Sequence, residues 1–359
     1  MSSGHYEALK GILLKQYALY PEMQLVDVVK LIYQSEFAGG HMIADEMASL
    51  QRLQAEWNSL QPASSQAPVF EELGDGLCRL NLAPILASGI TPATINRLFV
   101  LSANLHQGNV KSFEGKLAAL RQWCVDGLFR WDSVELDAYL RAYRAQGYPP
   151  VSHSEQYRSL HAPAYRVIRA EFKPYFELLC RIDQLMAKEE RVHIAIDGNS
   201  GAGKTSLARL LDQVYDCNVI HMDHFFLPLA LRTKARLSEA GGNIDYDRFS
   251  DEVLAGLASG KDFAYGIYDC AQGRIIEQVT VTSKQLNIIE GVYSMHPQFV
   301  AHYTLKVFLQ TDALTQSERI LLRNGAALHQ RFVQEWIPLE NAYFAAYKIA
   351  AQADLILSL

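Results

Sequence analysis

The chain has 359 residues, enough for two domains with a core each. Apolar residues make up 49% and charged residues 20%, as in ordinary soluble globular proteins. The net charge of −6 argues against a broad nucleic-acid-binding surface, and the five cysteines, widely spaced and without a C-x-x-C pair, support neither a disulfide framework nor a zinc site. No apolar run has the length of a membrane span or of a signal peptide's core. We therefore expect a cytoplasmic protein that binds neither membranes nor nucleic acid.

Helical patterns dominate the first half of the chain. Leu25–Ile32 places its apolar residues on one helix, and Thr91–Pro92 is typical of a helix start, with threonine as the N-cap and proline in the first turn. We also expect a helix over Tyr165–Met186, interrupted or kinked at Pro174. These patterns predict a mostly helical domain over residues 1–186, to which the sequence assigns no role.

Polar donors gather in one short segment before that last helix: His153, Ser154, Tyr157, Arg158 and His161. Two interpretations stay open. The donors could receive an anion, because charged and neutral hydrogen-bond donors are concentrated there. Alternatively, the segment is a solvated loop.

Short apolar strands alternate with helices in the second half, after the charged stretch Ala187–Arg191. Strands are expected at Val192–Asp197, Cys217–Met222, Leu286–Ile289, Leu305–Leu309 and Leu355–Leu357, and helices near 248–257, 314–323 and 341–351. This alternation predicts an α/β domain over residues 187–359, in which a parallel sheet carries helices on both faces. The active site of such a sheet lies at the carboxyl ends of its strands.

An octapeptide between the first of these strands and a helix matches G-x-x-x-x-G-K-[ST], the loop that surrounds a nucleotide's phosphates with backbone amides. The helix N-terminus adds unpaired N–H groups and the positive end of a dipole. Lys204 can reach the outer phosphates, and the Thr205 hydroxyl can bind Mg²⁺. The expected nucleotide contacts are Gly198, Asn199, Ser200, Gly201, Ala202, Gly203, Lys204, Thr205 and Ser206.

Two further strand ends carry carboxylates. Asp223 follows Val219–Met222, and Glu290 follows Ile288–Ile289. In a parallel sheet both project toward the bound phosphates, and a phosphotransferase needs one carboxylate to accept a hydroxyl proton and one to hold Mg²⁺ or its waters. His221 and His224 flank Asp223, but a third well-spaced ligand is missing, so we expect no dedicated transition-metal site.

These motifs together resemble the uridine kinase-like family of P-loop small-molecule kinases over about Arg191–Leu359. Besides the loop, four segments carry the similarity. Met222–Phe226 resembles the segment that bears the family's catalytic acid, and Asn243–Tyr246 resembles its ribose-binding Asn-Phe-Asp stretch. Tyr268–Cys270 resembles its Tyr-Asp-Phe motif, and Ile289–Gly291 resembles its Glu-Gly turn. The resemblance implies a P-loop NTPase-type fold, a five-stranded parallel sheet with flanking helices and a mobile lid.

The resemblance also implies roles for individual residues. Asp223 would be the general base, and ATP and Mg²⁺ would be the cofactors. The implied catalytic residues are Asp223, Lys204, Arg319 and Arg323; the acceptor contacts are Asp245, Tyr246, Tyr268, Glu290 and Arg331; and the Mg²⁺ ligands are Thr205 and Glu290. The chain departs from the family at the lid, where Arg323–Gly325 replaces a basic run, and at Ala271–Arg274, which lacks the family's histidine. The reaction type is therefore better supported than the acceptor.

The leading hypothesis is an ATP-dependent kinase that phosphorylates a hydroxyl of a small metabolite, with a nucleoside-like acceptor as the preferred class. A nucleotide-gated regulatory module, with the helical half as its effector, is the second hypothesis. An NTPase that acts through a protein partner is the third. Asp223 and the lid arginines favour the kinase, because a switch needs no acceptor base. The sequence leaves homo-oligomer formation open.

Overall fold

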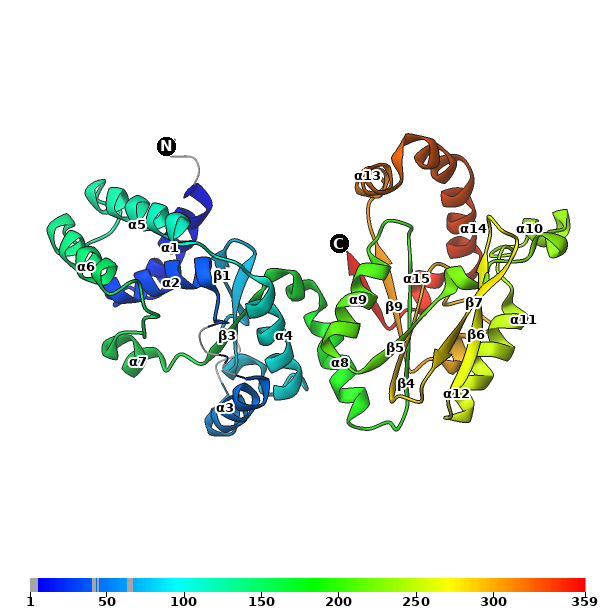
Figure 1. The fold of residues 1–359 in the computed structure, drawn as a ribbon, viewed down its shortest axis with the longest axis horizontal. Coiled ribbons are helices and arrows are strands. Elements are labelled where there is room, and N and C mark those ends of the chain that lie inside the picture. The colour runs from blue at the N-terminus through cyan, green and yellow to red at the C-terminus, as the bar shows by residue number, and fades with distance from the viewer. Residues whose placement is uncertain (1–5, 41–42, 44, 63–66, 359) are drawn as a thin grey trace. The chain divides into compact units, whose positions relative to one another are not determined.

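The computed structural model describes residues 6–40, 43, 45–62 and 67–358. Over these residues the chain divides into two compact units, Met1–Cys180 and Arg181–Leu359 (Figure 1). Within the described residues, no helix combines the length and the apolar character that crossing a membrane would require.

The first unit is mostly helical, as expected. Its helices are α1 (Glu7–Leu19), α2 (Leu25–Phe37), α3 (Glu46–Ser59), α4 (Pro92–Leu105), α5 (Val110–Val125), α6 (Ser133–Ala145) and α7 (Glu155–His161), and α8 (Phe176–Met186) continues into the second unit. The predicted N-cap of α4 is present, because Thr91 Oγ1 accepts a hydrogen bond from Thr94 N–H at 3.2 Å. The buried faces of α2 and α5 form the core of this unit together with α1 and α6.

A three-stranded antiparallel sheet, β1-β2-β3, completes the first unit. Its strands are β1 (Phe70–Gly74), β2 (Leu77–Asn81) and β3 (Tyr165–Arg169). The expected helix over Tyr165–Met186 was therefore wrong at its start, where β3 pairs with β2 and a 3₁₀ turn that contains Pro174 precedes α8. Hydrogen bonds to β2 decide this segment, and its aromatic and β-branched residues suit a strand.

The second unit is built on a five-stranded parallel sheet in the order β10-β9-β4-β8-β5. The strands are β4 (Val192–Gly198), β5 (Cys217–His221), β8 (Leu286–Glu290), β9 (Leu305–Gln310) and β10 (Leu355–Ser358), close to the predicted ranges. Every residue of β8 is buried, as in a central strand covered on both faces. The fold expected for this half is confirmed.

Two insertions stand beside the sheet. Between β5 and β8 lie three short helices, α10 (Lys234–Ser238), α11 (Tyr246–Phe249) and α12 (Ala255–Ser259). They are followed by an antiparallel hairpin of β6 (Phe263–Asp269) and β7 (Arg274–Val281), and the sequence did not predict this hairpin. Between β9 and β10 the chain forms α13 (Ala313–Arg331), then α14 (Ile337–Tyr347) and α15 (Ile349–Gln352). We call α13 and α14 the lid helices (Figure 1). Helix α13 is kinked at Gly325, where φ is 75°.

Candidate active site

The octapeptide loop joins β4 to α9 (Lys204–Val214), as predicted. Gly198 has φ +140°, and a Cβ there would collide with the backbone oxygen of Leu309 on β9. Gly203 has φ +99° directly before α9 begins. These positions need glycine because an L side chain rarely adopts such angles, and the loop runs too close to β9 for a side chain at Gly198.

Lys204 folds back over the loop. Its side chain is buried, and its Nζ donates to the carbonyl oxygens of Gly198 at 2.8 Å and Asn199 at 3.0 Å. The ammonium group therefore lies at the mouth of a loop that leads into a helix N-terminus. Backbone N–H groups, the helix dipole and a lysine together form a site suited to phosphates.

Thr205 and Glu290 meet at the carboxyl end of the sheet. The Thr205 hydroxyl donates to Glu290 Oε1 at 3.1 Å, and His221 Nδ1 lies 2.6 Å from the same oxygen. The hydrogen bond to Glu290 raises the pKa of His221. A hydroxyl and a carboxylate side by side are oxygen ligands of the type that Mg²⁺ prefers, so the donor set fits this ion. The described residues contain no cluster of three or more His, Cys, Asp or Glu side chains that could hold a metal ion.

Asp223 lies in a 3₁₀ turn, Met222–Phe225, directly after β5. Its carboxylate reaches solvent, yet protein surrounds it closely enough that desolvation raises its pKa, and the negative charge of Glu290 raises it further. Lys204, His221 and Arg323 act in the opposite direction. Asp223 is thus within electrostatic reach of the phosphate loop and of the lid. A more basic carboxylate that remains accessible suits proton abstraction.

The three lid arginines have different surroundings. Arg319 Nη1 donates to the Gly201 carbonyl oxygen of the phosphate loop at 3.3 Å. Arg323 lies near enough to Asp223 to affect its pKa. Arg331 instead pairs with Glu335 at 3.2 Å and lies over the Trp336 ring, so its interactions with the described residues keep it on its own helical segment.

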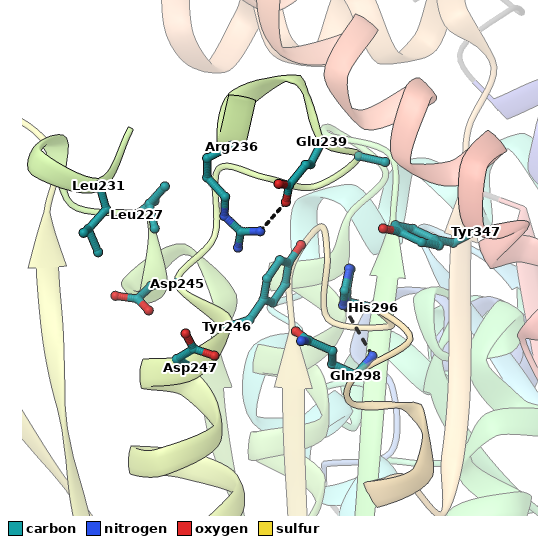
Figure 2. Close-up of a pocket in the computed structure, with 11 residues that line it drawn as sticks. Leu227, Leu231, Arg236, Glu239, Asp245, Tyr246, Asp247, His296, Gln298 and Tyr347 are labelled. Atoms are coloured by element: carbon teal, nitrogen blue, oxygen red, sulfur yellow. Dashed lines mark hydrogen bonds and ion pairs between the residues drawn. The ribbon is translucent and has the colours of Figure 1, made fainter. Parts of the chain in front are cut away.

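The expected acceptor residues lie in the insertion between β5 and β8. Asp245 Oδ1 caps α11 by accepting from Arg248 N–H at 3.2 Å, and the Tyr246 hydroxyl donates to the Gly241 carbonyl at 2.7 Å. Both residues line a hollow of about 540 Å³, together with His296. Figure 2 shows their side chains, with the Tyr246 ring beside the His296 ring on which it stacks. Asp223 and Tyr268 are not among the described residues that line this hollow.

Tyr268 stands at the end of β6, in the hairpin that the sequence reasoning missed. Its ring is buried, and its hydroxyl accepts a hydrogen bond from Leu229 N–H at 3.3 Å. The hairpin therefore holds Tyr268 against the segment that follows Asp223. The contact expected between Tyr268 and an acceptor stays a prediction.

Two buried carboxylates at the phosphate loop were not predicted. Glu340 of α14 accepts hydrogen bonds from Ser200, and Asp197, the last residue before Gly198, accepts from Gly198 N–H, Met295 N–H and the Tyr343 hydroxyl. Burial raises the pKa of Asp197 to about 6 against these hydrogen bonds. The sequence does show Asp197 directly before the glycine loop and Glu340 within an aromatic stretch. Only the fold reveals that α14 packs against the loop, so the sequence could not assign Glu340 to this site.

The donors singled out in the first half of the chain meet an internal carboxylate. His153 Nδ1 lies 2.9 Å from Asp27 Oδ1, and Ser154 donates to Asp27 through both its N–H and its hydroxyl. His153 Nε2 contacts the hydroxyl of Tyr165 at 2.7 Å. His153 and Ser154 are therefore used within the first unit, where Asp27 is the anion that they bind.

Comparison with known proteins finds similarity in the second half of the chain. Residues 193–326 match the sequence model of the Phosphoribulokinase / Uridine kinase family. Among solved structures, a protein described as a possible uridine kinase from Bacillus stearothermophilus is 20% identical, with a TM-score of 0.41, over 52% of this chain and 99% of that one. D-glycerate 3-kinase from Cryptococcus neoformans var. grubii is 14% identical, with a TM-score of 0.33, over 43% of this chain and 80% of that one. Over residues 193–326, the second half of the chain is therefore similar to P-loop kinases of the Phosphoribulokinase / Uridine kinase family.

Proposed function

We propose that the chain is an ATP-dependent phosphotransferase that phosphorylates a hydroxyl group of a small metabolite, with a nucleoside-like acceptor as the first choice. The observation that carries this proposal is the placement of Asp223, an accessible carboxylate of raised pKa, within electrostatic reach of Lys204 in the phosphate loop. The resemblance of Asn243–Tyr246 to a ribose-binding stretch supports the nucleoside-like acceptor.

The residues divide the reaction among them. The loop amides and Lys204 bind the β- and γ-phosphates of ATP. Thr205 and Glu290 would hold Mg²⁺, which when bound neutralises phosphate charge. Asp223 accepts the proton of the acceptor hydroxyl. As it does so, the hydroxyl oxygen of the acceptor forms a bond to the γ-phosphorus, and the bond from that phosphorus to the leaving oxygen of ADP breaks.

Charge on the transferring group needs further stabilisation. Arg319, already in contact with the loop, and Arg323, close to Asp223, can supply it from the lid. On the acceptor side we assign Asp245, Tyr246 and Tyr268 to the walls of the acceptor site, with Arg331 as a residue that a lid movement would have to bring in. The products are ADP and the phosphorylated acceptor, with the proton on Asp223.

A substrate screen tests the proposal. Purified protein with Mg²⁺ and ATP is offered nucleosides, sugars and vitamin-like alcohols, ADP release is followed by a coupled assay, and products are identified by mass spectrometry. We expect one acceptor class to gain a phosphate, and we expect Asp223→Asn to slow that gain by at least about 10²-fold. If nucleotide binds but no acceptor is phosphorylated, the regulatory module takes the place of the kinase.

A further inference from the structure

Glu340 makes an unusual contact between a lid helix and the phosphate loop. It lies on α14 with 5% of its surface exposed. Its Oε2 accepts from Ser200 N–H at 3.0 Å, and its Oε1 accepts from the Ser200 hydroxyl. Burial raises the pKa of Glu340, while the two Ser200 hydrogen bonds and the charge of Lys204 oppose that shift. Both donors of one loop residue are therefore directed to one buried carboxylate.

The other lid helix holds the opposite side of the same turn. Gln316 of α13 donates from Nε2 to the Ser200 carbonyl oxygen at 2.9 Å, next to the bond from Arg319 to Gly201. One turn beyond Glu340 on α14, the Tyr343 hydroxyl donates to Asp197 at 2.8 Å. Side chains from both lid helices thus bind the backbone or the base of the phosphate loop.

We propose that Glu340 is a positioning residue for phosphoryl transfer, which holds the Ser200–Gly201 turn against α14 and so links the position of the lid to the shape of the phosphate loop. This inference rests on the function proposed above. Glu340 touches no reacting atom by itself; it acts through Ser200.

The physical reason is that the amides of the loop must point at the phosphates. Glu340 accepts from the Ser200 N–H, and side chains of α13 donate to the carbonyl oxygens of Ser200 and Gly201, so the lid helices hold the orientation of these peptide groups. A displacement of about 1 Å in a positioning group can lower a rate by about 10²-fold. A loop released from the lid therefore still binds nucleotide but aligns it less well.

The test compares three single variants of the full-length protein and one double variant, Ser200→Ala/Glu340→Gln. Glu340→Gln keeps the shape but has one acceptor oxygen for two Ser200 donors; Ser200→Ala removes the hydroxyl donor; and Glu318→Gln, an exposed glutamate on the other lid helix, is the matched control. For each, kcat and KM for ATP are measured with the identified acceptor, Mg-ATP affinity by calorimetry, and Tm by thermal unfolding.

We expect Glu340→Gln to lower kcat by at least about tenfold while Mg-ATP affinity changes by less than about threefold, because the loop amides and Lys204 remain. Glu318→Gln should have the kcat, Mg-ATP affinity and Tm of the wild-type protein. The double variant Ser200→Ala/Glu340→Gln should lose less than the product of the single losses, since both act through one contact.

Two results would overturn the inference. One is an unchanged kcat in Glu340→Gln; the other is a double variant whose loss equals the product of the single losses, which would show that Glu340 does not act through Ser200. Either result leaves the proposed function intact, because the unchanged protein still phosphorylates its acceptor. If the unchanged protein neither binds Mg-ATP nor transfers phosphate, the proposed function fails first and the inference with it.

Discussion

Thr205 donates a hydrogen bond to Glu290 over 3.1 Å, which joins the first turn of α9 to the carboxyl end of β8. The two residues are far apart in the sequence, and the neighbouring parallel strands β4 and β8 bring them together. This contact places an oxygen-rich corner beside the phosphate loop. The following predictions test the site and the fold that creates it.

Lys204→Ala should slow phosphoryl transfer by about 10²-fold while the domain stays folded. The loop amides remain, but a charged phosphate contact worth about 3 kcal/mol is lost from the transition state, or about 10²-fold in rate. Turnover and Tm are measured beside Lys261→Ala, an exposed lysine of the same unit. Turnover equal to that of the unchanged protein would refute the role of the loop in catalysis.

Asp223→Asn should lower kcat by at least about 10²-fold and leave ATP affinity nearly unchanged. The amide keeps the shape of the side chain but cannot accept the hydroxyl proton. Calorimetry with a non-hydrolysable ATP analogue separates binding from turnover. If affinity collapses while the residual rate is normal, Asp223 holds metal or structure instead of acting as the base.

Gly198→Ala should destabilise the second unit by about 3 kcal/mol, because φ is +140° and the new Cβ would collide with Leu309 of β9. Gly11→Ala is the matched control, since Gly11 lies exposed in α1, and a Cβ added there would meet nothing within 4 Å beyond the backbone of its own helix. Alanine at this position should stabilise the helix by about 0.5–1 kcal/mol. Urea unfolding of both variants measures the difference, and equal effects would contradict the crowding at Gly198.

Acid should weaken the first unit through His153. Burial lowers the pKa of His153 to about 4, and the nearby Arg79 and Lys30 charges lower it while Asp27 opposes them. The unfolded value is about 6.5, so between pH 6.5 and 4 the unfolded chain binds a proton that the folded unit does not. The free energy of unfolding should therefore fall as pH falls through this window, by about 3 kcal/mol in full.

Tryptophan fluorescence can follow that loss, because Trp57, Trp123 and Trp131 lie in the first unit and Trp336 in the second. Urea unfolding of a Trp336→Phe protein, repeated from pH 4 to 7, reports on the first unit. His153→Gln should flatten the pH dependence whatever its starting stability. An equally steep pH dependence in that variant would assign the effect to another group.

A shortened chain should show where the kinase unit begins. The sequence places the boundary at Ala187, but in α8 Ile182 is buried, Asp183 accepts from the Tyr215 hydroxyl at 3.0 Å, and Arg181 donates to the Asp354 carbonyl at 2.9 Å. We expect a chain of residues 173–359 to fold and bind Mg-ATP, and one of residues 187–359 to melt several degrees lower. Equal Tm values would place the boundary after α8.

The sequence by itself determined the features that depend on local chemistry. The phosphate loop could be found because its glycines, Lys204 and Thr205 must be adjacent in the chain, between a buried strand and a helix. The five parallel strands could be found because apolar runs alternate with helical segments. Asp223 and Glu290 could be placed at the site because the carboxyl ends of parallel strands share one edge of the sheet.

Only the tertiary structure decided the features that depend on long-range contacts. Tyr165–Arg169 is a strand because β2 supplies its hydrogen-bond partners, although the sequence pattern favoured a helix. Glu340 reaches Ser200 because the chain folds α14 back onto the phosphate loop, and His153 meets Asp27 across 126 positions of sequence. Local periodicity carries no information about such pairs, since burial and hydrogen bonding at these residues are settled when distant elements pack together.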